Sequence, residues 1–214
     1  MSLVLYSYFR SSAAYRVRIA LNLKNVEYEI HPLHLLKKGG EQRQSAYRAV
    51  NPQGLVPALV VGDKVLTQSL AIIEYLEETY LSPPLMPGST IERAYVRSLA
   101  QIIACDIHPL NNLRVLNYLK DTFDGDTAHW YCHWIQEGFA ALEQLLERND
   151  CKGPFCLGDK PGMADVFLIP QIYNALRLHC EMKAFPLIGR IYENCLTEVA
   201  FSKAAPENQP DADS

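Results

Sequence analysis

The first 80 residues alternate between the two-residue hydrophobic period of strands and the 3.6-residue period of helices. A short apolar run at 3–8 and an alternating segment at 26–33 have the pattern of strands. Between them, residues 11–24 carry side chains at helical spacing, at positions Val17, Ala20, Leu21 and Lys24. The pattern predicts a strand, a helix with one apolar face, and a second strand.

The next segments predict the rest of a small α/β domain. Residues 39–54 have the composition of a loop and a short helix, closed by Asn-Pro and Gly. Two β-rich runs, 56–61 and 64–68, flank a Gly-Asp hairpin signal. An amphipathic helix is expected over 69–80. The order βαβ followed by αββα predicts a mixed four-stranded sheet.

Strand signals almost disappear after residue 80. Helical spacing continues over 89–120, 127–149, 163–180 and 187–202, and the last twelve residues are polar with two prolines. We therefore expect an α/β domain at 1–80, a proline-rich linker at 81–88, an all-helical domain at 89–202 and a loose tail at 203–214.

Composition and charge exclude several classes of partner. The 214 residues are 49% apolar, and 20 basic against 24 acidic residues leave a net charge of −4. This balance provides no broad basic field for a nucleic acid or an anionic membrane. No run approaches the roughly 18 to 20 apolar residues of a membrane span. The start lacks the basic segment of a signal peptide, so we expect a cytoplasmic protein.

The cysteines and histidines give weak signals. Six cysteines stand singly, without a Cys-x-x-Cys pair, which predicts reduced thiols rather than disulfides or a zinc site. His129 and His133 have the i, i+4 spacing of a metal pair, but they lack the glutamate of HExxH and an evident third ligand. We interpret their segment as aromatic helix packing and expect no metal.

Two predicted helices open with polar residues directly after strands. Ser11 and Ser12 begin the first, and Gln68 and Ser69 begin the third. Helix capping explains each pair taken alone. The same helix ends also favour an anion, and two of them at the edge of one small sheet could bracket an elongated, charged ligand. The stretch from 9 to 16 contains no acid, histidine or cysteine, which leaves open whose reactive group such a site would use.

Pro57 follows Val56 at the start of a predicted strand. An ordinary strand-start proline explains it, because the missing N–H is not needed there. A cis bond would instead turn the backbone of Val56 outward, toward a peptide-like ligand.

Longer motifs carry a family resemblance. The pattern SSxxxRVRIAL, NPxxxVPxL and QSLAIIEYLEE is continued in the second half by IHPLNNLRVL, GFAALEQLL and GDKPGMADVFLIPQIYNALR. Together these motifs resemble the zeta class of glutathione transferases, the maleylacetoacetate isomerase family. The resemblance covers nearly the whole chain. It implies a thioredoxin-like N-terminal domain, a cis proline at Pro57, an all-α C-terminal domain and a homodimer.

The resemblance also implies reduced glutathione as the cofactor. Ser11 and Ser12 match the positions that meet its sulfur, and the backbone of Val56 matches the one that binds its cysteinyl peptide. Gln68 and Ser69 match the positions for the γ-glutamyl carboxylate. Further glutathione positions are Ala13, Gln42, Pro57, His108 and Asn112. Arg177 is the first choice for the substrate carboxylate and Arg10 the second, although without the resemblance each would be interpreted as a solvated surface charge.

Three residues depart from the family pattern. Ala13 stands where the family usually has cysteine, His108 where glutamine is expected, and Gly162 where serine or threonine caps a helix. We expect Ala13 to leave the chemistry intact, because a protein cysteine could only assist the sulfur of the cofactor or form a mixed disulfide with it.

The implied reaction is cis–trans isomerisation of maleylacetoacetate to fumarylacetoacetate in tyrosine and phenylalanine breakdown, by thiolate addition, bond rotation and elimination. A second hypothesis keeps the cofactor but conjugates or dehalogenates small electrophiles such as α-haloacids. A third is a non-catalytic module of the same fold that binds a protein partner. The retained Ser11, Ser12, Gln68, Ser69 and Arg177 argue against the third.

Overall fold

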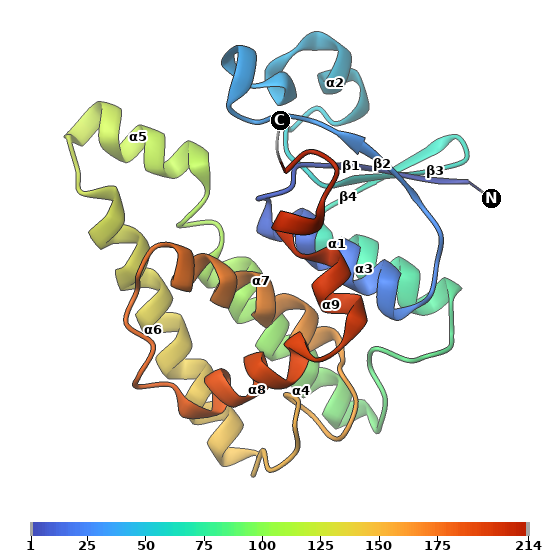
Figure 1. Ribbon diagram of the computed structural model, residues 1–214, viewed down its shortest axis with the longest axis vertical. Helices are drawn as coiled ribbons and strands as arrows, with labels where there is room; N and C mark the ends of the chain where they lie inside the picture. The colour runs from blue at the N-terminus through green and yellow to red at the C-terminus, as the bar shows by residue number, and fades with distance from the viewer. Residues whose placement is uncertain (1, 213–214) are drawn as a thin grey trace. The chain divides into compact units, whose positions relative to one another are not determined.

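The chain divides into two compact units. The structure is a computed structural model that describes residues 2–212. One unit comprises Met1–Pro84 with Glu198–Ser214, and the other comprises Leu85–Thr197 (Figure 1). The second boundary differs from the expected one, because the last helix of the chain belongs to the α/β unit.

The α/β unit is built on the predicted mixed four-stranded sheet. Its strands pair in the order β2-β1-β3-β4, with β2 parallel to β1 and β3 antiparallel to both β1 and β4. Leu5 lies opposite Ile30 on one side and Leu59 on the other, so the central strands carry the apolar core. The strands are β1 Leu3–Ser7, β2 Glu29–Pro32, β3 Ala58–Val61 and β4 Lys64–Thr67.

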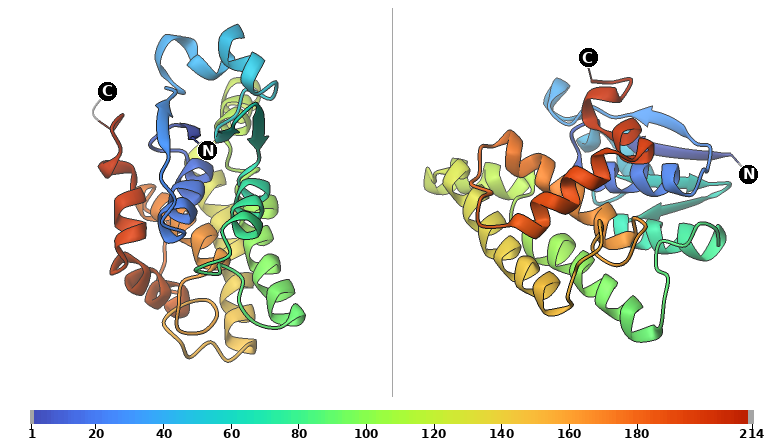
Figure 2. Two further views of the ribbon diagram at one scale, coloured as in Figure 1. Left: turned by 90° about the vertical axis from the view of Figure 1, so that its right-hand side faces the viewer. Right: turned by 60° about the horizontal axis from the view of Figure 1, so that its bottom comes forward.

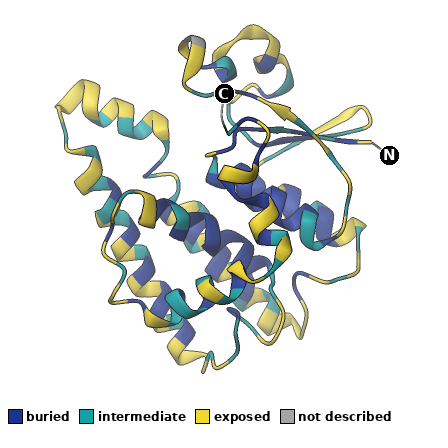
Figure 3. Cartoon of the chain, viewed as in Figure 1, coloured by how far each residue is buried: buried dark blue, intermediate teal, exposed yellow. Residues whose placement is uncertain are grey.

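Two long helices pack side by side on one face of this sheet, α1 (Ser12–Leu23) and α3 (Ser69–Thr79) (Figures 1 and 2). The short α2 (Ser45–Val50) follows two 3₁₀ turns, Lys37–Gly39 and Glu41–Arg43. The prediction of a single apolar face on α1 is wrong. Its residues from Ser12 to Leu21 are all buried, including two arginines, because α3 and α9 also pack against this helix (Figure 3).

The C-terminal residues do not form the predicted loose tail. Helix α9 (Val199–Ala204) packs against α1, and a 3₁₀ turn, Pro206–Asn208, follows it. Phe201 is fully buried, and the side-chain amide of Gln209 donates to two backbone carbonyls. Polar composition misled the prediction, because these polar groups find partners within the fold. Residues 213 and 214 of the expected tail lie outside the described residues.

The second unit is helical, as predicted. Helix α4 continues through a π-helical stretch, Ile102–Ile107, which ends before a turn, so the stretch of helical spacing at 89–120 is divided between α4 and α5. The apolar α7 is its most buried helix, whereas α5 has no buried residue (Figure 3). The helices are α4 Thr90–Gln101, α5 Leu113–Phe123, α6 Thr127–Arg148, α7 Met163–Arg177 and α8 Pro186–Leu196.

One disulfide corrects the expectation of reduced thiols throughout. Cys132 of α6 is bonded to Cys180, which lies just beyond α7, with the two Cα atoms 5.3 Å apart. The partners are 48 residues apart in sequence, so their spacing along the chain contained no sign of the pair. The other four cysteines, at positions 105, 151, 156 and 195, carry thiols.

Candidate active site

The N-terminus of α1 presents Ser11 at the end of the β1–α1 turn. Ser11 is the N-cap residue, and its Oγ accepts a hydrogen bond from the Ala14 backbone N–H at 3.2 Å. The predicted capping role is therefore real. A hydroxyl that accepts can still donate its own proton, and Ser11 is half-buried whereas Ser12 is only 6% exposed. No acidic residue in the first turn of α1 opposes an anion at this positive helix end.

The Val56–Pro57 peptide bond is cis, as the family resemblance implies. It stands directly before β3, and Val56 is half-buried. The preceding carbonyl, of Leu55, accepts two hydrogen bonds, from the Tyr47 hydroxyl at 2.6 Å and the Asn51 side-chain amide at 2.7 Å. Both donors are buried, so the backbone that leads into the cis bond is held rigidly.

The junction of β4 and α3 is strained at Gln68. Gln68 has a φ of 70° and a ψ of 119°, a backbone conformation that residues other than glycine rarely adopt. Its side chain makes no capping hydrogen bond to α3. Its amide donates to Gln53 Oε1 at 2.9 Å. The buried Ser69, first residue of α3, accepts from Arg16 Nη1 at 3.3 Å. Backbone strain of this kind costs about 1–3 kcal/mol and gathers at ligand sites.

Gln42 adds a buried acceptor to the same unit. Its side-chain nitrogen donates to the Leu35 carbonyl at 3.2 Å, and only 8% of the residue is exposed. Its Oε1 has no hydrogen-bond partner among the described residues. A buried acceptor without a donor is costly, so this oxygen suits an N–H group of a peptide-like ligand.

The two arginines expected to meet a carboxylate are both exposed. Arg10 belongs to the β1–α1 turn, and its guanidinium lies over the Phe9 ring, 4.9 Å from the centroid. Arg177 is the last residue of α7 and makes no hydrogen bond or ion pair within residues 2–212. Each guanidinium can therefore bind a carboxylate without first breaking an ion pair.

The α/β unit holds most of the predicted site residues, and the helical unit holds the other three. Asn112 caps α5, its Oδ1 accepting from the Arg114 N–H at 3.1 Å, and the half-buried His108 ends the π-helical stretch. Arg177 is the third site residue in the helical unit. The site residues of the α/β unit are Arg10, Ser11, Ser12, Ala13, Gln42, Val56, Pro57, Gln68 and Ser69.

Comparison with known proteins decides the family. The glutathione S-transferase N-terminal domain model matches residues 10–79, and the C-terminal domain model matches residues 128–188. The chain is 49% identical to a probable maleylacetoacetate isomerase of Vibrio cholerae over 99% of both chains. A holo structure of maleyl pyruvate isomerase, a bacterial glutathione S-transferase of the zeta class, superimposes with a TM-score of 0.94 at 46% identity, covering 98% of this chain and 99% of the other.

The chain belongs to the zeta class of the glutathione S-transferases. A maleylacetoacetate isomerase of Methylobacterium extorquens, solved with bound malonate and glutathione, has a TM-score of 0.93 and 40% identity over 99% of this chain and all of the other. Glutathione is the cofactor of this class, and the residues present fit it. The α/β unit offers two helix N-termini for its anionic groups, a Val56 backbone beside the cis bond, and the unsatisfied acceptor of Gln42.

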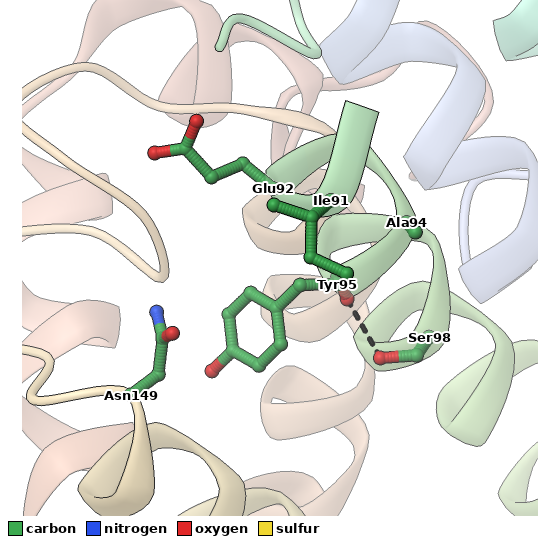
Figure 4. Close-up of a pocket in the computed structure, with 6 residues that line it drawn as sticks. All are labelled: Ile91, Glu92, Ala94, Tyr95, Ser98 and Asn149. Atoms are coloured by element: carbon green, nitrogen blue, oxygen red, sulfur yellow. Dashed lines mark hydrogen bonds between the residues drawn. The ribbon is translucent and has the colours of Figure 1, made fainter. Parts of the chain in front are cut away.

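A separate cavity in the helical unit is a poor candidate for this chemistry. It has a volume of about 450 Å³ and lies between α4 and the end of α6 (Figure 4). Its Tyr95 hydroxyl donates to the Leu145 carbonyl, and its Ser98 hydroxyl donates to the Tyr95 carbonyl. The cavity therefore offers a thiolate few polar groups that are not already engaged. Its lining residues are Ile91, Glu92, Ala94, Tyr95, Ser98 and Asn149.

Of the two histidines of α6, His133 lies in an aromatic cluster, whereas His129 is exposed. Trp134 contacts both Trp130, with ring centroids 5.6 Å apart, and His133, at 4.9 Å. Within the described part of the chain, no three His, Cys, Asp or Glu side chains gather as a metal site. Among the same residues, no helix is both long and apolar enough to cross a membrane.

Sequence reasoning missed the buried residues that contact the candidate site residues and the turn before them. Arg16 and Arg18 lie in an otherwise apolar helix and are both buried, Arg16 contacting Ser69 and Arg18 the β1–α1 turn. A charged residue inside an apolar pattern was the available signal, because a buried charge requires partners. Tyr47 and Asn51 carried no such signal, since their shared acceptor is a backbone carbonyl.

Proposed function

We propose that this protein catalyses the glutathione-dependent cis–trans isomerisation of maleylacetoacetate to fumarylacetoacetate, a step of tyrosine and phenylalanine breakdown. One observation carries the proposal: a half-buried serine hydroxyl, Ser11, stands at the positive end of α1 with no acid or base of its own. Such a site activates a thiol that the ligand brings. The isomerase names of near-full-length relatives support the choice of reaction.

When bound, glutathione would supply a thiolate for addition to the cis double bond, so that the resulting single bond could rotate before the thiolate is eliminated. Ser11 donates a hydrogen bond from its hydroxyl to that sulfur, and Ser12 is the next residue of the helix. The Val56 backbone binds the cysteinyl peptide, and Gln68 with Ser69 binds the γ-glutamyl carboxylate at the N-terminus of α3. These roles are assigned by family position, and the local geometry of each residue supports them.

The energy required from Ser11 is modest. A free thiol with a pKa near 8.5 is only about 7% thiolate at pH 7.4. Lowering that pKa by about two units requires roughly 2.7 kcal/mol of differential stabilisation. A hydrogen bond to a charged group contributes about 1.5–3 kcal/mol, and the helix N-terminus adds to it. One hydroxyl and one helix end therefore suffice without a catalytic acid or base.

Arg177 and, as second choice, Arg10 bind the carboxylates of the substrate. A guanidinium matches a carboxylate with two parallel hydrogen bonds, and both side chains are exposed. His108 and Asn112 are proposed as further glutathione contacts. A homodimer and a cytoplasmic location stay predictions, the former from the family resemblance and the latter from the sequence.

The same activated thiolate suits a second activity, conjugation or dehalogenation of small electrophiles such as α-haloacids. The observation that favours it is the start of α1, which carries the Ser11 and Ser12 hydroxyls but no acidic residue that would select a double bond. The relative kcat/KM on the two substrate types decides between the activities.

The test is the conversion of maleylacetone, followed by absorbance with and without glutathione. Rapid cis-to-trans conversion that requires glutathione and consumes none of its thiol establishes the isomerase. Bound glutathione without conversion indicates the transferase instead. A protein that neither converts maleylacetone nor binds glutathione resin would be a non-catalytic module of this fold.

A further inference from the structure

The last residues of the chain reach the turn that presents Ser11. The Asp211 carboxylate accepts a hydrogen bond from the backbone N–H of Phe9 at 3.0 Å, across 202 residues of sequence. Asp211 is 6% exposed and Phe9 is 7% exposed, so the bond is buried. A hydrogen bond to a carboxylate is roughly twice as strong as one to a neutral acceptor.

Arg18 holds the other side of the same residue. Its Nη2 donates to the Phe9 carbonyl at 3.0 Å, so both backbone polar groups of Phe9 are bound by buried charged side chains. Its Nη1 donates to Ser7 Oγ at 3.0 Å and to the Tyr8 carbonyl at 3.4 Å. Its Nε donates to the Ala204 carbonyl at 3.0 Å, which ties α9 to the same guanidinium.

This network continues to Ser11. The Tyr8 carbonyl that Arg18 contacts also accepts the backbone N–H of Ser11 at 2.9 Å. A chain of hydrogen bonds therefore leads from Asp211 through Phe9, Arg18 and Tyr8 to the residue that caps α1. A shift of the Phe9 peptide would therefore also displace Ser11.

We propose that Asp211 and Arg18 act together as positioning residues for the active site, holding the β1–α1 turn so that Ser11 can donate a hydrogen bond to the sulfur of glutathione. Asp211 is a positioning residue, since it acts through the Phe9 peptide. The inference rests on the proposed function, in which the Ser11 hydroxyl donates a hydrogen bond to the glutathione sulfur. Removing Asp211 should then lower kcat more than glutathione affinity, because Gln68 and Ser69 are untouched.

The experiment compares three variants of the full chain. Asp211→Ala removes the acceptor, and we expect kcat for maleylacetone to fall about tenfold while the KM for glutathione stays within twofold. Asp211→Asn keeps an oxygen for the Phe9 N–H and should recover most of the lost rate. Glu207→Ala removes an exposed carboxylate from the preceding 3₁₀ turn and should match the wild type.

Hydrogen–deuterium exchange tests the hydrogen bond between Asp211 and the Phe9 amide even where a variant folds poorly. In the wild type, the Phe9 amide should exchange as slowly as the amides of the core strand β1. In Asp211→Ala it should exchange at least tenfold faster, while Glu207→Ala leaves it unchanged. Fast exchange of Phe9 in the wild type overturns the proposal without any variant.

The remaining outcomes separate this inference from the proposed function. An unchanged kcat in folded Asp211→Ala, or equal losses of rate and glutathione affinity, overturns the positioning role. If the wild type does not isomerise maleylacetone, the proposed function fails alone. The ultraviolet absorbance of the bound thiolate then serves as the readout, and it should diminish in Asp211→Ala at neutral pH but not in Glu207→Ala.

Discussion

Arg16, in the second turn of α1, donates a hydrogen bond from Nη1 to the Oγ of Ser69, the first residue of α3, at 3.3 Å. Arg16 is 1% exposed, and the bond joins two helices that each follow a strand of the sheet. Arg16 thus fixes the rotamer of the hydroxyl proposed to meet the γ-glutamyl carboxylate, and it brings a positive charge to that end of the site.

Replacing Arg16 with methionine should raise the dissociation constant of glutathione about tenfold, equivalent to about 1.4 kcal/mol. Titration calorimetry measures this change, and the loss should shrink in a Ser69→Ala background because the two residues act together. Arg148→Met, at an exposed position, is the control. An equal loss for a glutathione analogue without the γ-glutamyl carboxylate would contradict the assignment.

Replacing Ser11 separates its two roles, because alanine and glycine differ as helix caps. Ser11→Ala should lose about 1 kcal/mol of unfolding free energy, and Ser11→Gly only a few tenths. Both variants lack the hydroxyl, so both should lose kcat by a similar factor, about tenfold or more. Denaturant unfolding and the maleylacetone assay measure the two effects. If kcat fell with the loss of stability, so that Ser11→Gly kept its activity and Ser11→Ala did not, Ser11 would be excluded as the hydrogen-bond donor to the sulfur.

Gln68→Gly should make the protein more stable but weaken its binding of glutathione. Glycine adopts the φ of 70° without strain, so the unfolding free energy should rise by about 1 kcal/mol, after allowance for the greater flexibility of glycine in the unfolded chain. The dissociation constant of glutathione should rise several-fold as the side chain is lost. Gln53→Ala, which removes only the partner of the Gln68 amide, should leave stability nearly unchanged. A Gly variant less stable than the wild type would show that the strain is negligible.

The stability of the protein should decrease in alkaline solution through Tyr47. Burial raises the pKa of Tyr47 from its ordinary value of 10 to about 12, although the hydrogen bond with Asn51 opposes the shift. The unfolded chain releases this proton near pH 10, while the folded protein retains it to about pH 12. The free energy of unfolding therefore falls as the pH rises between these values.

Tyr47→Phe has no such proton, so its stability should decrease less steeply over the same range. Urea unfolding at several pH values measures both slopes, and the difference between the proteins should be constant from pH 7 to 9. Loss of the hydrogen bond to Leu55 should also cost the variant about 1 kcal/mol at neutral pH. Parallel curves up to pH 12 would contradict the raised pKa.

The Cys132–Cys180 disulfide should contribute about 2–4 kcal/mol to stability, because it closes a loop of 48 residues in the unfolded chain. Adding a strong thiol reductant should lower the melting temperature of the wild type to that of the Cys132→Ser/Cys180→Ser double variant, on which the reductant has no effect. Cys151→Ser, which leaves the bond intact, should respond to reductant as the wild type does. A melting temperature insensitive to reductant would exclude the bond.

Local pattern alone predicted most of the secondary structure and part of the site. The β-rich runs at 56–61 and 64–68 correspond to β3 and β4, and the polar opening at Ser11 is the N-cap of α1. These features are local in sequence, since a strand face repeats every two residues and a helix cap involves neighbours three positions apart. Family motifs added the cis bond at Pro57, which no local pattern distinguishes from a trans bond.

The sequence by itself determined which segments become strands and helices, because the periodicity of apolar side chains selects the face that each element buries. Only the tertiary structure decided which buried charges meet which backbone groups. Arg18 and Asp211 converge on Phe9, and Cys132 meets Cys180, through contacts between residues that lie from 9 to 202 positions apart. Such partners are selected by the packing of whole elements, so the residues expected to form a loose tail instead support the turn that carries Ser11.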